Sequence, residues 1–219
     1  ACAPFRRLSL CNKNMEKKGT TKITDKNDLL ADVCLAAKYE GESIKTHYQQ
    51  YEAQYPGSGS TMCTMLARSF ADIGDIVRGK DLYIGNKKEN KQRKQLEENL
   101  KTIFGKIYKD VTSGNKGKTN SALQARYIGD TTDFFKLRED WWTVNRATVW
   151  KAITCGTHDG DTYFHATCSD SHRKGTFSQA NHYCRCNGDK PGEDKANIDP
   201  PTYFDYVPQF LRWFEEWAQ

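Results

Sequence analysis

The chain has 219 residues, a hydrophobic share of 37%, a charged share of 28% and a formal net charge of +5. Its mean hydropathy of −0.82 is typical of a globular protein with a well-solvated exterior, and its aromatic content excludes a disordered chain. No apolar run approaches the roughly 18–20 residues that cross a bilayer, and the first residues lack the apolar core of a signal peptide.

Two helices are predicted in the first third of the chain. Apolar residues recur at helical spacing over 25–40, and Gly41 either ends this helix or interrupts a longer one. A second helix is predicted over 61–78, with Gly79 as its stop. Gly74 in its middle costs about 1 kcal/mol relative to alanine, which suggests that another helix crosses close to its backbone.

The second helix carries a charged face as well as an apolar one. Arg68, Asp72, Asp75 and Arg78 stand at i, i+3 and i, i+4 spacing. Such pairs contribute only tenths of a kcal/mol when they are exposed. They matter more if they clamp a neighbouring helix, and we assign these four residues to the scaffold.

The middle of the chain predicts two further helices separated by a loop over 111–121. The first, over about 89–109, has an apolar stripe beneath a row of lysines. The second runs over about 131–153 and is rich in tryptophan. Its aromatic residues fall on two neighbouring stripes, so we expect a central helix that is covered on more than one side. Its scaffold residues are Trp141, Trp142, Arg146 and Trp150.

The last third of the chain predicts an irregular excursion and a final helix. Residues 156–199 are rich in Gly, Asp, His and Lys and lack periodicity, with a short strand expected near 162–165. Pro208 fits the first turn of the last helix. That helix is expected to bury Phe210, Trp213, Phe214 and Trp217. The fold class is therefore all-α, with long irregular loops.

Eight cysteines indicate an oxidising compartment. They allow on the order of 100 pairings, so their connectivity does not follow from spacing. Cys184 and Cys186 are too close to bond each other comfortably. Zinc is the alternative for Cys168, His172, His182, Cys184 and Cys186, but their spacing does not match zinc-binding patterns, and no metal or cofactor is expected.

Positive charge is concentrated in one segment. Residues 86–118 contain ten Lys/Arg against four Asp/Glu, a net charge of +6. Such a stripe attracts polyanions such as sulfated glycans, acidic membrane headgroups or nucleic acid; the alternative is a helix face that only aids solubility. The candidate receptor-binding or glycan-binding residues are Lys87, Lys88, Lys91, Arg93, Lys94 and Lys101.

Other chemistries find little support. Gly117-Lys118-Thr119 resembles the end of a phosphate-binding loop, but Thr112 stands where that motif requires glycine. No nucleophile elbow, zinc-protease helix or glycine-rich nucleotide turn is present, so we expect no enzyme. Nucleic-acid binding is a stronger alternative than catalysis, because lysines can bind phosphates while aromatic residues stack on bases. The cysteines, which indicate an extracellular location, and the aromatic residues, which face the core, argue against it.

Four motifs in order carry a resemblance to a known family. They are the Ala1–Cys11 segment, Ala67-Arg68-Ser69-Phe70-Ala71-Asp72-Ile73-Gly74-Asp75-Ile76-Val77-Arg78-Gly79, the Trp-Trp-x-x-Asn-Arg helix and Asp205–Trp217. Together they resemble the Duffy-binding-like domains of malaria-parasite adhesins, most closely the alpha class of the erythrocyte membrane protein 1 family.

The resemblance implies an adhesion domain on the infected red-cell surface, held by a distant transmembrane segment. Its implied partners are a host cell-surface receptor or sulfated glycan and an adjacent cysteine-rich adhesion domain. It also implies truncation, with an irregular remnant of subdomain 1 at 1–24. Subdomain 2 and the start of subdomain 3 then form a helical bundle over 25–219, with the excursion at 156–202.

The resemblance further implies a disulfide framework. Cysteines that match Cys63 and Cys155 bond each other in related domains, and those that match Cys2 and Cys11 bond to upstream partners. The four others then form two bonds in an unspecified order: Cys34, Cys168, Cys184 and Cys186. The alternative function is a structural and antigenic spacer, with the receptor site in a neighbouring domain.

Overall fold

A computed structural model describes residues 2–17, 26–54, 61–113, 121–130, 132–169 and 177–218. The described part is mainly helical, which agrees with the predicted all-α class. Two short strands, β1 (Cys168–Ser169) and β2 (Phe177–Ser178), pair antiparallel, and residues Phe204–Tyr206 form the 3-10 helix η2. The α-helices are α1 (Phe5–Leu8), α2 (Lys13–Lys17), α3 (Lys26–Gln54), α4 (Met62–Arg78), α5 (Lys87–Thr112), α6 (Ser121–Arg126), α7 (Phe135–Ile153) and α8 (Gln209–Ala218).

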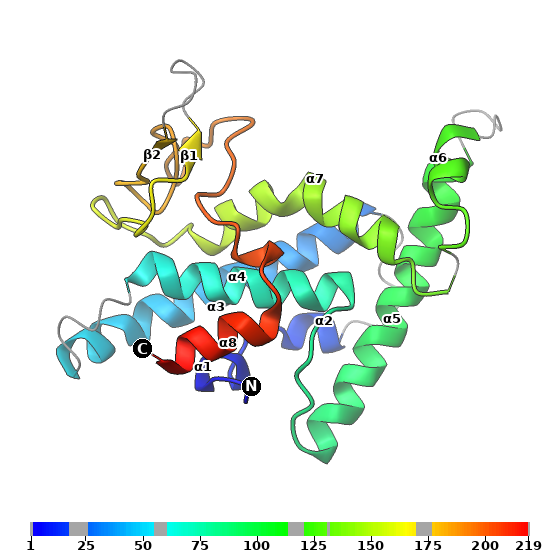
Figure 1. The fold of residues 1–219 in the computed structure, drawn as a ribbon, viewed down its shortest axis with the longest axis horizontal. Coiled ribbons are helices and arrows are strands. Elements are labelled where there is room, and N and C mark those ends of the chain that lie inside the picture. Colours follow the sequence, from blue (N-terminus) through cyan, green and yellow to red (C-terminus); the bar gives the residue numbers. More distant parts are fainter. Residues whose placement is uncertain are drawn as a thin grey trace.

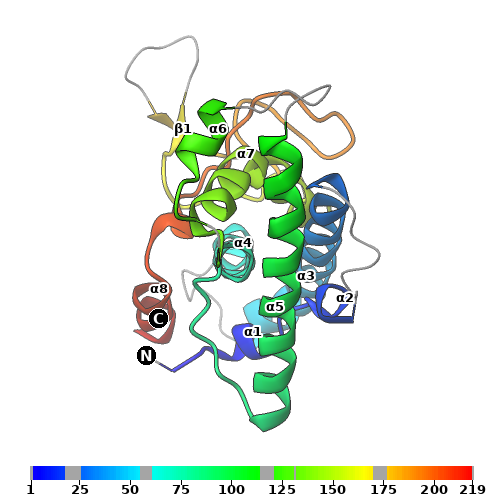
Figure 2. The ribbon, with the colours of Figure 1, turned by 90° about the vertical axis from the view of Figure 1, so that its right-hand side faces the viewer.

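Helix α4 is the central element of the molecule. Figure 2 looks along it and shows α3, α5, α7, α8 and α1 around it. Every residue of α4 except Met65 is buried, so this helix, rather than the tryptophan-rich one, is the most enclosed. The N-cap Thr61 accepts a hydrogen bond from the Thr64 amide at 3.3 Å, and Gly79 ends the helix in the left-handed conformation with φ 73°.

Two glycines allow helices to pack closely. A Cβ atom at Gly74 would lie 2.7 Å from Cζ2 of Trp142, so the α7 indole occupies the space over this residue, as the sequence suggested. A Cβ at Gly41 would collide with the Ile153 carbonyl oxygen. Gly41 therefore lies inside α3, which runs unbroken to Gln54, and α7 contacts the α3 backbone there.

Aromatic rings fill the space between α4 and α7. The Phe70 ring lies 5.1 Å from the Trp142 ring and 5.2 Å from the Trp150 ring, between centroids. Trp142 is fully buried, whereas Val144 on the same helix is 78% exposed. Helix α7 is thus covered on the tryptophan side and open to solvent on the other.

Helix α8 does not bury the residues that its pattern predicted. Trp213 is 3% exposed, but Phe210, Phe214 and Trp217 are between 50% and 70% exposed. Gln209 and Arg212 are buried in their place. The reason lies in α4, which presents Asp72 and Asp75 to α8 and so selects its polar side.

The two ends of the bundle carry irregular structure. The excursion after α7 lies at one end, and α6 lies at the other, beyond the C-terminal turns of α5 (Figure 1). The predicted strand near 162–165 is wrong, because β1 and β2 follow later in the excursion. Helices α1 and α2 stand where an irregular segment was predicted, and α1 contacts α4 while α2 contacts α3 and α5.

Candidate functional site

The basic helix α5 begins at a capping box. The Asn86 side-chain oxygen accepts hydrogen bonds from the amides of Lys88 and Glu89, and the Glu89 carboxylate accepts from the Asn86 amide at 2.8 Å. These bonds satisfy amides that a helix end otherwise leaves without partners. The cap fixes the first turn of α5, which contains Lys87 and Lys88, and this end of the helix projects past the rest of the bundle (Figures 1 and 2).

Four of the six predicted basic residues form one exposed face. Lys87, Lys91 and Lys94 follow each other at i, i+4 and i+7, and Lys88 stands one turn from Lys91. All four side chains are exposed. Among the described residues, none forms an ion pair with them. We call Lys87, Lys88, Lys91 and Lys94 the α5 lysine face.

The other two predicted residues serve the fold. Arg93 lies 3.3 Å from the Asp81 carboxylate, donates to the Asp81 carbonyl at 3.0 Å and stands over the Tyr83 ring. Lys101 lies 2.9 Å from Asp133 and 3.3 Å from Glu98. The charge of each is therefore matched by a carboxylate, so neither belongs to the lysine face.

The glutamates of α5 do not neutralise this face. Glu89 accepts from the Tyr83 hydroxyl at 2.9 Å as well as from the cap. Glu97 binds Arg138 of α7 with distances of 2.7 and 2.9 Å, and Glu98 pairs with Lys101. Glu89 and Glu97 thus bind residues outside α5, Glu98 pairs with Lys101 on the helix itself, and the four lysines face solvent.

Arg138 anchors α5 to the core. Its fully buried guanidinium donates to the Val77 carbonyl at 2.6 Å and to the Ile76 carbonyl at 3.2 Å, at the C-terminal end of α4. The same group holds Glu97 and lies over the Phe104 ring. One arginine therefore joins α4, α5 and α7 and holds the lysine face on a rigid support.

A buried charge network joins α4 to α8 and the N-terminal segment. The Asp72 carboxylate is fully buried and accepts from Arg6 at 2.7 Å, Arg212 at 2.8 Å and Gln209 at 3.1 Å. Burial opposes its ionisation, but the positive charges of Arg6 and Arg212 outweigh that cost and hold the pKa of Asp72 below its usual value.

Neighbouring scaffold residues extend the network. Asp75 binds Arg212 at 2.5 Å and Arg78 at 2.8 Å, and burial raises the pKa of Asp75. Arg68 donates to Glu215 of α8 at 3.0 Å. All four charged residues predicted for this face of α4 are buried, and three of them bind α8 directly.

A second centre lies at Asp205, before α8. Its carboxylate accepts from the indole of Trp142 at 2.8 Å and from Arg146 at 2.8 Å through two nitrogens. Arg146 also donates to the Thr202 carbonyl at 2.7 Å. Trp142 and Arg146 of the Trp-Trp-x-x-Asn-Arg motif thus hold the segment that leads into α8, whereas the Asn145 side chain donates to the Trp141 carbonyl within α7. The Trp150 indole donates instead to the Cys184 carbonyl at 3.0 Å.

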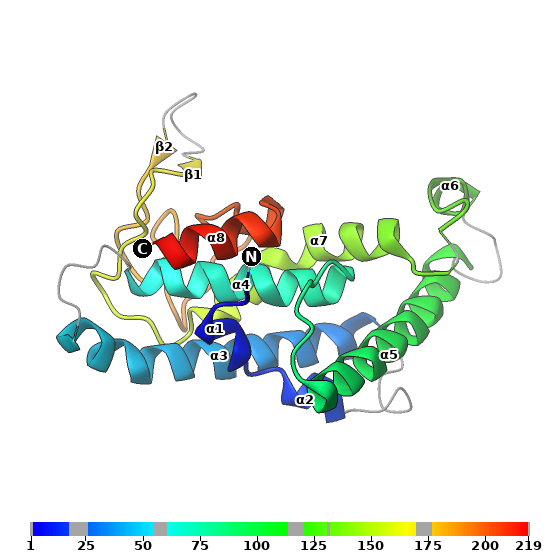
Figure 3. The same cartoon turned by 60° about the horizontal axis from the view of Figure 1, so that its bottom comes forward.

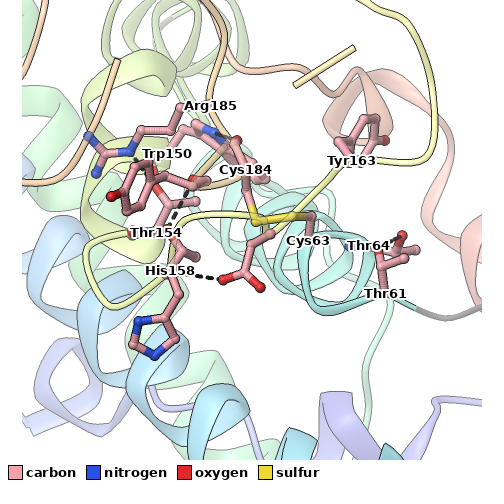
Figure 4. Close-up of a disulfide and its surroundings, with 12 residues drawn as sticks. Thr61, Cys63, Thr64, Trp150, Thr154, His158, Tyr163, Cys184 and Arg185 are labelled. Atoms are coloured by element: carbon pink, nitrogen blue, oxygen red, sulfur yellow. Dashed lines mark hydrogen bonds between the residues drawn. A yellow bond between two sulfur atoms is a disulfide. The ribbon is translucent and has the colours of Figure 1, made fainter. Parts of the chain in front are cut away.

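One disulfide fastens the excursion to the bundle, and a second one closes a loop within the excursion. Cys63 bonds Cys184, and Cys168 bonds Cys186. The implied Cys63–Cys155 bond is therefore wrong, because the excursion folds back and brings Cys184 to the start of α4 (Figure 4). The same sulfurs are unavailable to zinc, and no group of three or more metal-binding side chains occurs among the described residues; His172 lies outside them.

Four cysteines are free of disulfides in the described part of the chain: Cys2, Cys11, Cys34 and Cys155. The implied bond between Cys34 and one of the three excursion cysteines is also wrong. Cys168 and Cys186 pair across a short loop, and Cys63 takes Cys184. This leaves Cys34 on α3 with no sulfur from the excursion.

Sequence reasoning missed an apolar pocket at the meeting point of the two chain ends. It has a volume of about 650 Å³ and lies between the N-terminal segment, α3, α4 and α8. Phe5 and Trp217 stand at its rim with ring centroids 5.7 Å apart, and the Trp217 indole donates to the Cys2 carbonyl at 2.9 Å. The sequence did contain a signal for this pocket, because α8 has more aromatic residues than one buried stripe requires.

The described helices include none that is long and apolar enough to span a membrane. Among curated proteins, no sequence matches the chain significantly. Residues 1–212 match the Duffy binding domain family. Solved structures from the same family add the detail that follows.

Two solved structures come from the varO strain of Plasmodium falciparum. The NTS-DBL1(alpha-1) domain of membrane protein 1 (PfEMP1) is 40% identical with a TM-score of 0.73, over 100% of this chain and 43% of that one. The NTS-DBL1-alpha and CIDR-gamma double domain is 39% identical with a TM-score of 0.71, over 100% of this chain and 28% of that one.

A third structure is the DBLbeta domain of another PfEMP1 protein bound to ICAM-1. It is 29% identical with a TM-score of 0.65, over 100% of this chain and 44% of that one. The chain therefore spans less than half the length of the solved relatives it matches. The family match and the shared fold agree with the four motifs, and the chain belongs to the Duffy binding domain family, with its similarity to the DBL domains of PfEMP1 extending over its whole length.

Proposed function

We propose that this chain is an adhesion domain of a variant surface antigen on infected erythrocytes. Duffy-binding domains of this family are adhesion domains rather than enzymes. Relatives have been solved as an ICAM-1 complex and as a double domain with CIDR-gamma. By analogy, the partners of this chain are a host cell-surface receptor and an adjacent cysteine-rich domain of the same polypeptide.

The α5 lysine face is the proposed contact for a sulfated glycan or an acidic receptor patch. The observation that carries this proposal is the separation of charge on α5: four lysines face solvent, while Glu89, Glu97 and Glu98 bind structural partners. Fixed charges that neighbouring carboxylates do not cancel attract polyanions over a distance of about 8–10 Å at physiological salt.

Heparin chromatography tests this contact directly. The face variant is Lys91→Glu with Lys94→Glu, and the control is Lys109→Glu with Lys136→Glu. The control pair is also exposed and changes the net charge equally, but it lies outside the face. We expect the face variant to elute at clearly lower salt than both the wild type and the control. Equal elution of the two variants would contradict the proposed site.

The alternative is an antigenic spacer, with the receptor site in a neighbouring domain. One observation favours this alternative. Arg93 and Lys101 form ion pairs with Asp81 and Asp133, so only four of the six predicted basic residues remain available to a ligand. A spacer would not bind red cells by itself. Binding of the chain to red cells, with and without soluble heparin, separates the two functions.

A further inference from the structure

Two cysteines of the helical core remain outside the disulfides. Cys34 lies on α3 and Cys155 lies in the turn directly after α7, and both are half-buried. The two residues line the same open pocket of about 290 Å³, together with Ala31, Leu35, Lys38 and Ala152. This pocket is a different feature from the lysine face and from the pocket at the chain ends.

The helices that carry these cysteines are neighbours. Helices α3 and α7 run side by side (Figures 1 and 3). They approach so closely that Gly41 contacts the Ile153 carbonyl, two residues before Cys155. No bulky side chain therefore separates the end of α7 from α3 at this point.

Neither cysteine has another partner nearby. The four excursion and α4 cysteines are bonded to one another. Of the remaining two, Cys2 is at the chain end, and the Cys11 amide donates to Glu40 at 2.9 Å. Glu40 is six positions after Cys34, and each residue turns a helix by about 100°, so Cys11 contacts another side of α3.

We propose that Cys34 and Cys155 form a third disulfide, which draws the turn after α7 onto α3 and closes the pocket between them. A disulfide requires Cα atoms within about 7 Å of each other, so the pocket is the space that closure removes. The bond would fix the point at which the excursion leaves α7. Cys63–Cys184 fixes its return to α4, so both ends of the excursion would then be tied.

The chemistry is thiol–disulfide exchange with an oxidised partner such as oxidised glutathione. A thiolate of the pair attacks one sulfur of oxidised glutathione, breaks its S–S bond and forms a mixed disulfide with one glutathione, while the second glutathione leaves as a thiol. The second cysteine then attacks the mixed disulfide and releases the other thiol. Two S–H bonds are lost, one S–S bond forms, and the two electrons reduce the oxidant.

Burial gives this reaction a pH dependence. Desolvation raises the pKa of the Cys34 thiol to about 11, so very little of its reactive thiolate exists at neutral pH. Steps in which Cys34 attacks should therefore accelerate as the pH rises towards 11.

Peptide mapping without reduction tests the bond. The chain is folded in a mixture of reduced and oxidised glutathione, alkylated with iodoacetamide and digested. We expect a peptide pair linked through Cys34 and Cys155, lighter by two hydrogen atoms than the two thiol peptides. Recovery of both cysteines as alkylated thiols, or of either one bonded to another residue, would overturn the proposal.

Single variants provide a second readout. Cys34→Ser should leave Cys155 open to alkylation, and Cys155→Ser should leave Cys34 open, while Cys63–Cys184 remains intact in both. If neither substitution changes the alkylation of the other cysteine, the two are not a pair. The wild-type peptide map decides the question alone if a variant does not fold, and it is independent of any receptor binding.

Discussion

At the residue scale, Asp72 is the carboxylate on which the α4–α8 contact depends. Its fully buried carboxylate joins Arg6, Arg212 and Gln209. The sequence indicated that Asp72 stands on the charged face of its helix, because helical spacing gives faces directly. It did not indicate the partners, because Arg6 and Arg212 come from distant segments whose positions depend on the whole packing.

Replacing Asp72 with asparagine tests this network. The substitution removes the buried charge that Arg6 and Arg212 share and leaves them with Glu216 and Asp75 respectively, so we expect the free energy of unfolding to fall by about 3–5 kcal/mol at pH 7. The pKa of Asp72 is lowered in the folded state, so its stabilisation is complete above the unfolded value of about 4. That stabilisation is lost as the pH falls through the lower folded value.

Urea unfolding at a series of pH values measures the effect. The difference between the wild type and Asp72→Asn should be constant from neutral pH down to about pH 5 and should shrink below about pH 4. A difference that grows as the solution becomes more acidic would show that another group controls the α4–α8 contact.

Two helical glycines make a matched pair for a second prediction. A methyl group at Gly74 would meet the Trp142 ring at 2.7 Å, whereas one at Gly105 would meet Phe134 at an ordinary 3.5 Å. We expect Gly74→Ala to destabilise the protein by about 1–3 kcal/mol. Gly105→Ala should stabilise it by about 0.5–1 kcal/mol, because alanine is the better helix former. Thermal unfolding of both variants measures this: the unfolding temperature should fall for Gly74→Ala and rise for Gly105→Ala.

At the scale of elements, the end of α4 was predicted closely because Gly79 is a local stop signal. The orientation of α8 was predicted wrongly. Its pattern of Phe210, Trp213, Phe214 and Trp217 suggested a buried apolar stripe, yet only Trp213 is buried. Local hydrophobicity cannot show that the partner helix presents carboxylates, and this selected the side with Gln209 and Arg212.

Two substitutions in α8 test its orientation. Trp213→Ala should reduce the free energy of unfolding by about 3–5 kcal/mol, since it empties a packed site. Phe214→Ala should change it by no more than about 0.5 kcal/mol, because this ring is 70% exposed. Similar losses for the two variants in chemical denaturation would mean that α8 packs with a different face.

At the scale of the whole molecule, eight cysteines indicated disulfide fastening, but their pairing required the fold. The return of Cys184 to the start of α4 depends on the course of an excursion that has no regular pattern. The candidate site likewise could not be defined fully without the fold. The sequence placed six basic residues on one helix, but only packing shows that Arg93 and Lys101 meet carboxylates from elsewhere.

The two disulfides should contribute unequally to stability. Cys63–Cys184 has a sequence separation of 121 and Cys168–Cys186 one of 18. The chain-entropy relation then assigns about 5 kcal/mol to the first and about 3 kcal/mol to the second. Denaturant unfolding of Cys63→Ala/Cys184→Ala and Cys168→Ala/Cys186→Ala measures both losses, and a larger loss from the short loop would contradict this order.

Binding of the chain to red cells tests the central claim most directly, that the α5 lysine face on this disulfide-fastened bundle is an adhesive surface. Wild type, Lys91→Glu/Lys94→Glu and Lys109→Glu/Lys136→Glu are compared at equal concentration, each with and without soluble heparin. The account predicts that the wild type and the control bind and are displaced by heparin, while the face variant binds weakly. Equal binding by all three proteins, unaffected by heparin, would contradict it.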